Sequence, residues 1–305
     1  MHDVLIVGGG PAGMTAAVYA GRKKLDTALV SRDLGGQALW SLKVENYMGY
    51  QYVSGQELMD KFREQMAQFP VEQHLGSEVA RVSALGSGFV AEAGRGERHE
   101  ARTVIIATGK RSRPLDVPGE KELIGRGVSY CATCDGPLFR DLEVAVVGGG
   151  VSALTAAVDL AKVARTVYLV HGGSRWQAAP ALVDRALASE RVQALLGYSV
   201  TAVRGDGQVS ALAVRTPQGE AQDLAVEGVF VETGLIPSSE CAADLVELNP
   251  QREIVVDCDA ATSRPGVFAA GDVTSVPAKQ IVVAAGDGAK AALGAHRFLL
   301  SGRKG

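Results

Sequence analysis

The chain has 305 residues, and its 31 basic and 34 acidic side chains leave a net charge of −3 at pH 7. This near balance excludes the basic field of a nucleic-acid-binding protein and a polybasic membrane patch, so we expect neither nucleic acid nor a membrane as a partner. The length exceeds that of one typical hydrophobic core, and the 47% hydrophobic content suits a packed globular protein with two domains.

The N-terminal residues MHDVLIVGGG enter a strand pattern almost at once. They lack the charged region, apolar run and small-residue cleavage site of a signal peptide. Elsewhere no apolar run reaches the roughly 18 residues that span a bilayer. We therefore expect a cytoplasmic location. In that reducing compartment a CxxC pair, formed here by two of the four cysteines, is typical of catalysis or metal binding.

A strand, a glycine-rich turn and an Ala-rich helix are predicted twice, in VLIVGGGPAGMTAAV from Val4 and in VAVVGGGVSALTAAV from Val144. The turns carry the dinucleotide fingerprint, as GxGxxG at Gly8, Gly10 and Gly13 and as GxGxxA at Gly148, Gly150 and Ala153. These glycines permit a tight turn and let backbone N–H groups approach a pyrophosphate at the helix N-terminus. One such motif is also compatible with a turn that binds nothing, but two copies predict a protein that binds two nucleotides.

The segment VSYCATCDGPLF places Cys131 and Cys134 two residues apart, with Asp135 directly after them. A structural zinc site needs about four ligands, yet Cys241 and Cys258 are single and the five histidines are scattered. A structural disulfide across so short a loop adds little constraint to the unfolded chain. A redox pair, in which one thiolate attacks and the other resolves, is therefore favoured. Asp135 fits either an acid–base role or a helix N-cap.

The same order of a strand, a glycine turn and a proline occurs in two segments, Arg102–Pro114 and Gly228–Ser239. We predict that the chain crosses between the domains in these segments. A later strand within Gly266–Ser275 precedes a C-terminal Ala-rich helix. The predicted fold is α/β, with two Rossmann-like dinucleotide-binding domains of which the second is inserted in the first. We expect the first domain at 1–112 and 236–305, and the inserted domain with the CxxC pair at 113–235.

Together these motifs resemble the low-molecular-weight thioredoxin reductases, and the resemblance covers almost the whole chain. The motifs that carry it are GGGPAG (8–13), GGQ (35–37), VENYMGY (44–50), ATG (107–109), CATCDG (131–136), GGGVSA (148–153), GVFAAGDV (266–273) and KQIVVAAGDGAKAA (279–292). The most specific is CATCD, just before the second fingerprint. The resemblance implies a homodimeric FAD-dependent disulfide oxidoreductase, a flavoprotein that passes electrons from FAD to the cysteine pair and on to a thioredoxin-like protein.

The resemblance also assigns cofactor residues by position. FAD would be bound in the discontinuous domain by Gly8, Gly10, Pro11, Ala12, Gly13, Gly36, Gln37, Asn46, Thr108, Gly109, Gly271, Asp272, Lys279, Gln280 and Ile281. Among these, Asp272 would bind a ribitol hydroxyl, unless it is a solvated turn residue. Gln280 and Ile281 would present backbone N–H groups to the flavin carbonyls. The second nucleotide site would comprise Gly148, Gly150, Val151, Ser152, Ala153, His171, Arg175 and Trp176.

For the redox pair, the resemblance places Cys134 against the flavin and makes Cys131 the thiol that attacks the protein substrate. Asp135 would be the acid and base that serves the two thiols. In this family the inserted domain rotates about its two crossings, so that one pair meets the flavin and then an external protein. We expect the same motion here. A flavin-binding redox sensor without turnover is the non-enzymatic alternative, and the intact CATCD motif argues against it.

The sequence departs from the family where NADPH is selected. NADPH-using members carry a run of the type HRRxxxRA, whereas this chain has HGGSRWQA at 171–178. Gly172, Gly173 and Gln177 stand where the three arginines would grip the 2′-phosphate, and Arg175 is out of register. No acidic residue ends the strand to hold a ribose 2′-hydroxyl. The sequence therefore does not favour NADPH, and it does not clearly favour NADH.

Three alternatives stay open for the electron donor. NADPH could bind weakly through Arg175 and other residues, or the site could take NADH or nothing. The third alternative, which we favour, is a protein independent of pyridine nucleotides that accepts electrons from ferredoxin or holds a second FAD in the NADPH-type site. Trp176 would then stack on an adenine or a flavin ring, unless it is an ordinary half-buried tryptophan.

Overall fold

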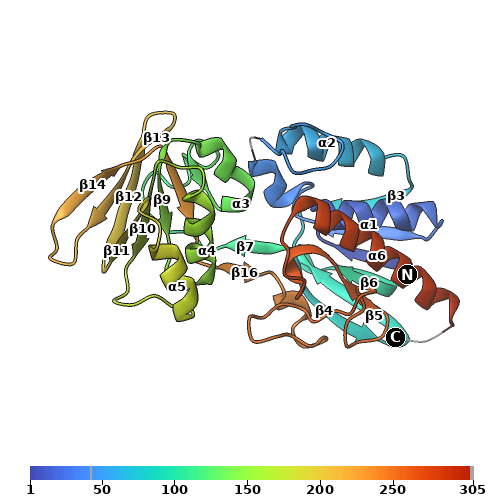
Figure 1. Cartoon of the computed structure of the whole chain (residues 1–305). Coiled ribbons are helices and arrows are strands. Elements are labelled where there is room, and N and C mark those ends of the chain that lie inside the picture. The colour runs from blue at the N-terminus through green and yellow to red at the C-terminus, as the bar shows by residue number, and fades with distance from the viewer. Residues whose placement is uncertain (42, 303–305) are drawn as a thin grey trace. The chain divides into compact units, whose positions relative to one another are not determined.

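The computed structural model describes residues 1–41 and 43–302, with Arg95 described by its backbone alone. The chain divides into two compact units: unit 1 comprises Met1–Arg111 and Ile236–Gly305, and unit 2 comprises Ser112–Leu235. The chain passes between them twice, in strands β7 (Lys110–Ser112) and β16 (Leu235–Pro237), which pair as a two-stranded sheet (Figure 1). None of the helices within residues 1–41 and 43–302 has the length together with the hydropathy that a membrane span requires.

Unit 1 is built on a seven-stranded sheet in the order β3-β2-β1-β6-β5-β4, with β17 also paired to β6. Its strands are β1 (His2–Val7), β2 (Thr27–Ser31), β3 (Val71–Leu75), β4 (Val79–Leu85), β5 (Gly88–Ala93), β6 (Glu97–Ile106) and β17 (Val267–Ala269). The pairs β1–β2, β2–β3, β1–β6 and β17–β6 are parallel, whereas β4–β5 and β5–β6 are antiparallel. The central strand β1 is buried along Val4–Val7, as expected of a parallel strand covered on both faces.

Helices cover this sheet, and the glycine turns lead from strands into helices. They are α1 (Pro11–Arg22), α2 (Gly55–Met66) and α6 (Ile281–Leu300), with short 3₁₀ turns η1 (Gly36–Trp40), η2 (Gly94–Gly96), η4 (Glu240–Ala242) and η5 (Gly271–Val273). A capping box between Ser54 and Glu57 begins α2. Helices α1 and α6 lie so close that a Cβ at Gly288 would be 2.1 Å from the Ala12 carbonyl oxygen. Small residues along both helices therefore permit this contact.

Unit 2 contains a five-stranded parallel sheet in the order β11-β10-β9-β15-β8. Its strands are β8 (Val128–Ser129), β9 (Glu143–Val147), β10 (Thr166–His171), β11 (Val192–Leu196) and β15 (Gly228–Val231). A three-stranded antiparallel sheet joins β12 (Ser199–Gly205), β13 (Val209–Arg215) and β14 (Ala221–Ala225). The helices are α3 (Ala132–Asp135), α4 (Val151–Leu160) and α5 (Pro180–Leu187), with the 3₁₀ turn η3 (Gly136–Phe139).

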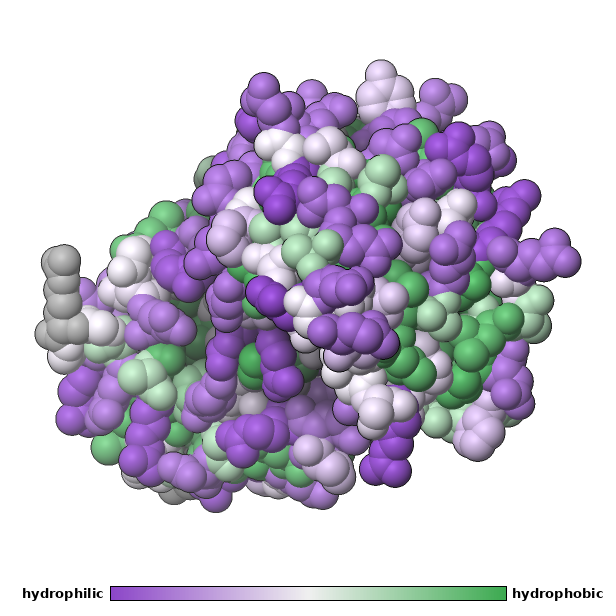
Figure 2. All heavy atoms as spheres, turned by 90° about the vertical axis from the view of Figure 1, so that its left-hand side faces the viewer, coloured by the Kyte–Doolittle hydropathy of each residue, from purple (hydrophilic) through white to green (hydrophobic). Residues whose placement is uncertain are grey.

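Two apolar clusters pack unit 2, one with α4 and the other with the antiparallel sheet. The parallel strands alternate between them, since Val144 and Val146 belong to the first cluster and Ala145 and Val147 to the second. The predicted α/β fold with two Rossmann-like units is thus confirmed. On the face shown in Figure 2, hydrophilic side chains predominate and apolar ones lie between them, which is ordinary for a folded surface.

Candidate active site

The first glycine turn of unit 1 connects β1 to α1. Gly8 has φ +109°, and a Cβ there would lie 2.3 Å from the Ala107 carbonyl oxygen. A Cβ at Gly13 would lie 1.9 Å from the Gly8 carbonyl oxygen, so only glycine lets the helix pack this close to the strand. Gly10 is the N-cap of α1 without a side-chain cap, and a Cβ there would meet nothing within 4 Å. The turn therefore presents an open helix N-terminus, which suits a phosphate group.

Several residues predicted for FAD binding gather at this turn. The Thr108 backbone nitrogen is 3.0 Å from a Cβ built on Gly8. A Cβ built on Gly36 would lie 3.7 Å from the Gly10 Cα. Gly271 has φ +75° and approaches the Ala12 side chain. The structure thus brings three other segments of the chain to this turn, as a shared ligand would require.

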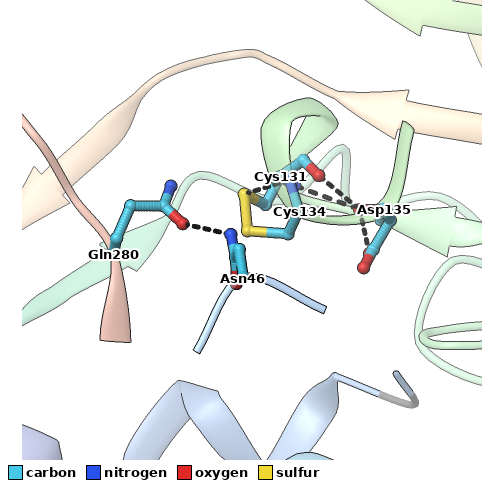
Figure 3. Close-up of a disulfide and its surroundings, with 6 residues drawn as sticks. Asn46, Cys131, Cys134, Asp135 and Gln280 are labelled. Carbon is cyan, nitrogen blue, oxygen red and sulfur yellow. Dashed lines mark hydrogen bonds between the residues drawn. A yellow bond between two sulfur atoms is a disulfide. The ribbon is translucent and has the colours of Figure 1, made fainter. Parts of the chain in front are cut away.

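The side chains of several predicted flavin residues also form hydrogen bonds with other segments of unit 1. Asn46 donates a 2.9 Å hydrogen bond through Nδ2 to Oε1 of Gln280, the N-cap residue of α6 (Figure 3). The Gln37 side chain donates to the Lys110 carbonyl. Thr108 donates through its hydroxyl to the Ser238 carbonyl at 2.6 Å. The side chains of Gln37 and Thr108 therefore hold backbone segments in place.

Asp272 lies in η5 next to a half-buried cluster that contains two lysines. Burial raises the pKa of Asp272, while Lys279 and Lys110 lower it. Glu253 Oε1 accepts a hydrogen bond from the Lys110 Nζ at 2.5 Å, and it lies 3.5 Å from the Lys279 Nζ. The two lysine side chains are 9% and 14% exposed. Burial in turn lowers the pKa of Lys279. Asp272 is thus a half-buried carboxyl whose pKa the two lysines also influence.

Lys110 and Glu253 of this cluster were not predicted from the sequence. Asn249 also belongs to it, because its Nδ2 donates to Glu253 Oε2 at 2.6 Å. Lys110 follows the ATG motif directly, which was the one available signal. Glu253 stands in a segment without a motif, and only the fold brings it between the lysines.

In unit 2 the two cysteines of the CxxC motif form a closed disulfide. The S–S distance is 2.06 Å and the Cα–Cα distance is 5.3 Å (Figure 3). Cys131 is the N-cap of the short helix α3, and its Sγ accepts the Cys134 backbone N–H at 3.2 Å. Among the described residues no group of three or more His, Cys, Asp or Glu side chains could hold a metal ion. In the structure the pair is therefore a disulfide.

Asp135 ends α3 and faces the pair through Ser129. The Ser129 hydroxyl donates to Asp135 Oδ2 at 2.6 Å and accepts the Cys131 backbone N–H at 3.0 Å. Burial raises the pKa of Asp135, and the hydrogen bond from Ser129 lowers it. Cys131 is the N-cap of α3, and Asp135 stands at the N-cap position of η3 without a side-chain cap hydrogen bond. A carboxyl with a raised pKa suits proton transfer.

A second buried carboxyl, which no sequence motif indicates, supports the residue before Cys131. Glu120 is 0% exposed and accepts the backbone N–H groups of Leu115 and Asp116 at 2.8 and 2.9 Å. It also accepts the Tyr130 hydroxyl at 2.8 Å, and burial together with this bond raises the pKa of that phenol. This carboxylate fixes the segment that leads into the redox pair.

The second glycine turn, between β9 and α4, keeps the backbone of a nucleotide cradle. Gly148 has φ +153°, and a Cβ there would lie 2.3 Å from the Glu232 carbonyl oxygen. Gly150 is the N-cap of α4, and a Cβ there would meet nothing within 4 Å. Ala153 is buried against the strand. The geometry of this turn thus matches that of the first one.

Side chains of the HGGSRWQA segment cover part of that turn. The His171 ring would be 2.4 Å from a Cβ on Gly149, and Trp176 stacks on it with ring centroids 5.7 Å apart. The Gln177 backbone N–H pairs with the Gly149 carbonyl at 2.7 Å. His171 Nε2 is buried and has no hydrogen-bond partner among the described residues. Trp176 is half-buried against the α4 core, whereas Arg175 is exposed.

Comparisons with known proteins agree with this architecture. Residues 2–288 match the family model of the pyridine nucleotide-disulphide oxidoreductases. The chain is 44% identical over 303 residues to the alkyl hydroperoxide reductase F protein of Pseudomonas putida, covering 98% of this chain but 58% of that protein. It is 41% identical to a bifunctional thioredoxin reductase/thioredoxin of Mycobacterium leprae, covering 98% of this chain and 66% of the relative. The chain thus spans less than two thirds of these curated relatives.

Solved structures also match nearly the whole chain. The thioredoxin reductase of Streptococcus pyogenes is 40% identical, covers 99% of each chain and superposes with a TM-score of 0.94. The resemblance seen in the motifs is therefore confirmed. The chain belongs to the pyridine nucleotide-disulphide oxidoreductase family, within its thioredoxin-reductase-like branch.

Proposed function

We propose that this protein holds FAD in unit 1 and passes two electrons through the Cys131–Cys134 pair to a disulfide of a thioredoxin-like protein. The observation that carries the proposal is the closed disulfide beside Asp135, a carboxyl whose pKa burial raises. A partner of this class is supported by the relative from Mycobacterium leprae, which is named a bifunctional thioredoxin reductase/thioredoxin. We extend the proposal to a cytoplasmic homodimer.

The residues of unit 1 fit FAD. The open N-terminus of α1 at Gly10 suits a pyrophosphate, and the half-buried Asp272 carboxyl suits a ribitol hydroxyl. Gln280 and Ile281, at the start of α6, are assigned to the flavin carbonyls. When bound, FAD supplies the two-electron chemistry that reduces a disulfide.

The chemistry of unit 2 follows from three side chains. Reduction of the Cys131–Cys134 disulfide takes two electrons and two protons and gives two thiols. The Cys131 thiolate then attacks the partner disulfide and forms a mixed disulfide, and one partner sulfur leaves as a thiolate. The Cys134 thiolate displaces the other partner sulfur and closes the original disulfide. Asp135 gives and takes the protons, because its pKa is raised toward the working pH.

For the electron donor we propose ferredoxin or a second FAD in the NADPH-type site. The three arginines of NADPH-using members are replaced by Gly172, Gly173 and Gln177. The His171 ring, with Trp176 stacked on it, covers Gly149 of the second turn. An ordinary NADPH-dependent thioredoxin reductase is the alternative. A role as the reductase component of an alkyl hydroperoxide reductase is a second candidate, because the relative from Pseudomonas putida is 44% identical.

An anaerobic titration of the FAD-loaded protein tests the donor. NADPH and then NADH are added while the visible absorbance of the flavin is followed, and reduced ferredoxin and dithionite are added to separate samples. We expect bleaching by ferredoxin or dithionite and none by either pyridine nucleotide, and a flavin count per chain then separates one FAD from two. Rapid bleaching by NADPH would overturn the proposed donor. The disulfide reaction is tested separately, by the loss of protein disulfide reduction in Cys131→Ser.

A further inference from the structure

Glu253 lies in unit 1, and the chemistry above does not use it. The Glu253 N–H donates to Asn249 Oδ1 at 2.8 Å. The next residue, Ile254, donates its N–H to the Val273 carbonyl at 2.9 Å, and its own carbonyl accepts the Ser275 N–H at 2.9 Å. The backbone of Glu253 is thus held beside the end of η5.

The Glu253 carboxylate lies between two lysines from distant parts of the chain. Its Oε1 is 2.5 Å from Lys110 Nζ and 3.5 Å from Lys279 Nζ, and its Oε2 accepts the Asn249 Nδ2 at 2.6 Å. The side chains of Lys110, Lys279 and Glu253 are 9%, 14% and 15% exposed. Water and salt therefore screen these charges far less than those of a surface pair.

Lys279 also closes the loop that leads into α6. Its Nζ donates to the Thr274 carbonyl at 2.6 Å, so that one side chain bridges the two ends of this loop. The next residue, Gln280, is the N-cap of α6 and is assigned to FAD under the proposed function. Through Lys279, the Glu253 carboxylate thus reaches the start of α6.

Glu253 alone does not balance the charges of this cluster, because two lysines face one carboxylate. Burial lowers the pKa of Lys279 and Lys110 lowers it further, whereas Glu253 and Asp272 raise it. Without the Glu253 charge, both ammonium groups would stay at a site with little water and no carboxylate between them, which is costly. Lys279 would then lose its proton or leave the cluster, and the loop before α6 would open.

We propose that Glu253 is a positioning residue of the FAD site, whose carboxylate holds Lys279 against Thr274 and so fixes the loop before α6 in the form that binds the cofactor. This inference rests on the proposed binding of FAD in unit 1. The role depends on the charge of Glu253, so the experiments remove that charge while they keep the size of the side chain.

The first measurement is the reactivity of the Lys279 amine in the flavoprotein as purified. The protein is treated briefly with acetic anhydride at pH 8, and peptide mass spectrometry follows Lys279 and the exposed Lys121 of unit 2, an internal reference. In Glu253→Gln we expect Lys279 to react about three- to tenfold faster, because the group that favours its protonated form is gone. Equal Lys279 rates in Glu253→Gln and the parent would overturn the inference.

Lys110→Met should act in the opposite direction. Glu253 then serves Lys279 alone and a neighbouring cation is removed, so the pKa of Lys279 should rise and its acetylation should slow about threefold. If Glu253→Gln does not fold, as judged by circular dichroism, Lys110→Met replaces it. A Lys279 rate that does not fall in Lys110→Met would overturn the inference.

The second measurement is the affinity for FAD, read from the fluorescence of FAD that is released when the flavoprotein is diluted. Glu253→Gln should raise the dissociation constant at least about tenfold. Glu253→Asp keeps the charge on a shorter side chain and should lie closer to the parent, although glutamine matches glutamate better in size. A Glu253→Asp variant that binds FAD as weakly as Glu253→Gln would overturn the inference.

Glu240→Gln is the matched control. Glu240 pairs at 2.9 Å with Arg111, the residue after Lys110, but the two side chains are 52% and 56% exposed. Such a surface pair contributes little, so Lys279 reactivity and FAD affinity should match the parent. Equal effects in Glu240→Gln and Glu253→Gln would overturn the inference.

The parent protein separates this inference from the proposed function. A parent that binds no FAD would overturn the proposed function and, with it, a positioning role toward FAD. A parent that binds FAD, with a Glu253→Gln variant that binds it equally well, would overturn the inference alone. Neither measurement needs the electron donor or the disulfide partner, so failure of the titration above is a different outcome.

Discussion

The Ser129 hydroxyl donates a 2.6 Å hydrogen bond to the Asp135 carboxylate, and it accepts the backbone N–H of Cys131 at 3.0 Å. One hydroxyl therefore joins the proposed acid–base group to the redox pair. Because the bond from Ser129 favours ionised Asp135, it opposes the effect of burial on the pKa of that carboxyl.

Ser129→Ala should raise the pKa of Asp135 further, because the donor that favours its carboxylate is lost. The part of the pH profile of disulfide reduction that depends on this carboxyl should move to higher pH, and the protein should lose about 1 kcal/mol of unfolding free energy. Ser77→Ala is the matched control, since Ser77 donates to the exposed Glu97 at 3.0 Å in unit 1. A profile that does not move in Ser129→Ala would contradict the proposed coupling.

The two cysteines should behave differently toward a thioredoxin-like protein. Cys134→Ser leaves the attacking thiol without its resolving partner, so the prereduced variant should accumulate a mixed disulfide through Cys131. Cys131→Ser should accumulate far less, and both variants should keep bound FAD. Non-reducing gels and peptide mass spectrometry separate these outcomes. The opposite pattern, with trapping through Cys134, would exchange the two roles.

His171→Ala should uncover the second glycine turn. The ring of His171 lies against Gly149, so its removal should increase the affinity for ADP-ribose, used as a probe of a pyrophosphate cradle, by about tenfold. Isothermal calorimetry measures the change. His296→Ala is a suitable control, because His296 also has a buried ring nitrogen without a partner among the described residues but belongs to α6 of unit 1. Equal affinities in His171→Ala and the parent would contradict this prediction.

Two glycines of α6 should respond in opposite directions to alanine. At Gly288 the new Cβ would lie 2.1 Å from the Ala12 backbone carbonyl, so α1 and α6 must separate and FAD binding should weaken. We expect a loss of at least about 2 kcal/mol of unfolding free energy. At exposed Gly286 the Cβ meets nothing within 4 Å, and alanine should stabilise the helix by about 0.5–1 kcal/mol. Denaturant titrations of both variants check the difference, and equal effects would contradict it.

Stability should fall in mild acid because of His99. Its side chain is 8% exposed and lies 4.3 Å from the His74 ring, and burial and His74 lower its pKa. The folded state thus binds its proton at lower pH than the unfolded state, so unfolding free energy is lost as pH falls below about 6.5. In His99→Phe this loss should be smaller in denaturant titrations from pH 7.5 to 5. An unchanged slope would show that other groups govern the acid sensitivity.

The sequence was sufficient to predict what depends on local pattern. The buried VLIV and VAVV runs, the glycine turns and the CxxC spacing each specify a short-range geometry, and the structure has β1, β9, both turns and the disulfide at these positions. The side chain of Asp135 could not be assigned in this way. Its two candidate roles differ only in what lies around the carboxyl, and that was set by Ser129 and by burial.

Tertiary structure decided the rest, because it depends on segments far apart in the chain. Glu253 contacts Lys110 across 143 positions, and neither stands in a motif that predicts the other. The Ser152 hydroxyl reaches the Glu232 carbonyl across 80 positions only because β15 lies beside β9 in the sheet. A strand specifies its own burial through its apolar residues, but its neighbours depend on the whole sheet. The sequence thus determined the cradles and the redox pair, while the fold determined which charges surround them.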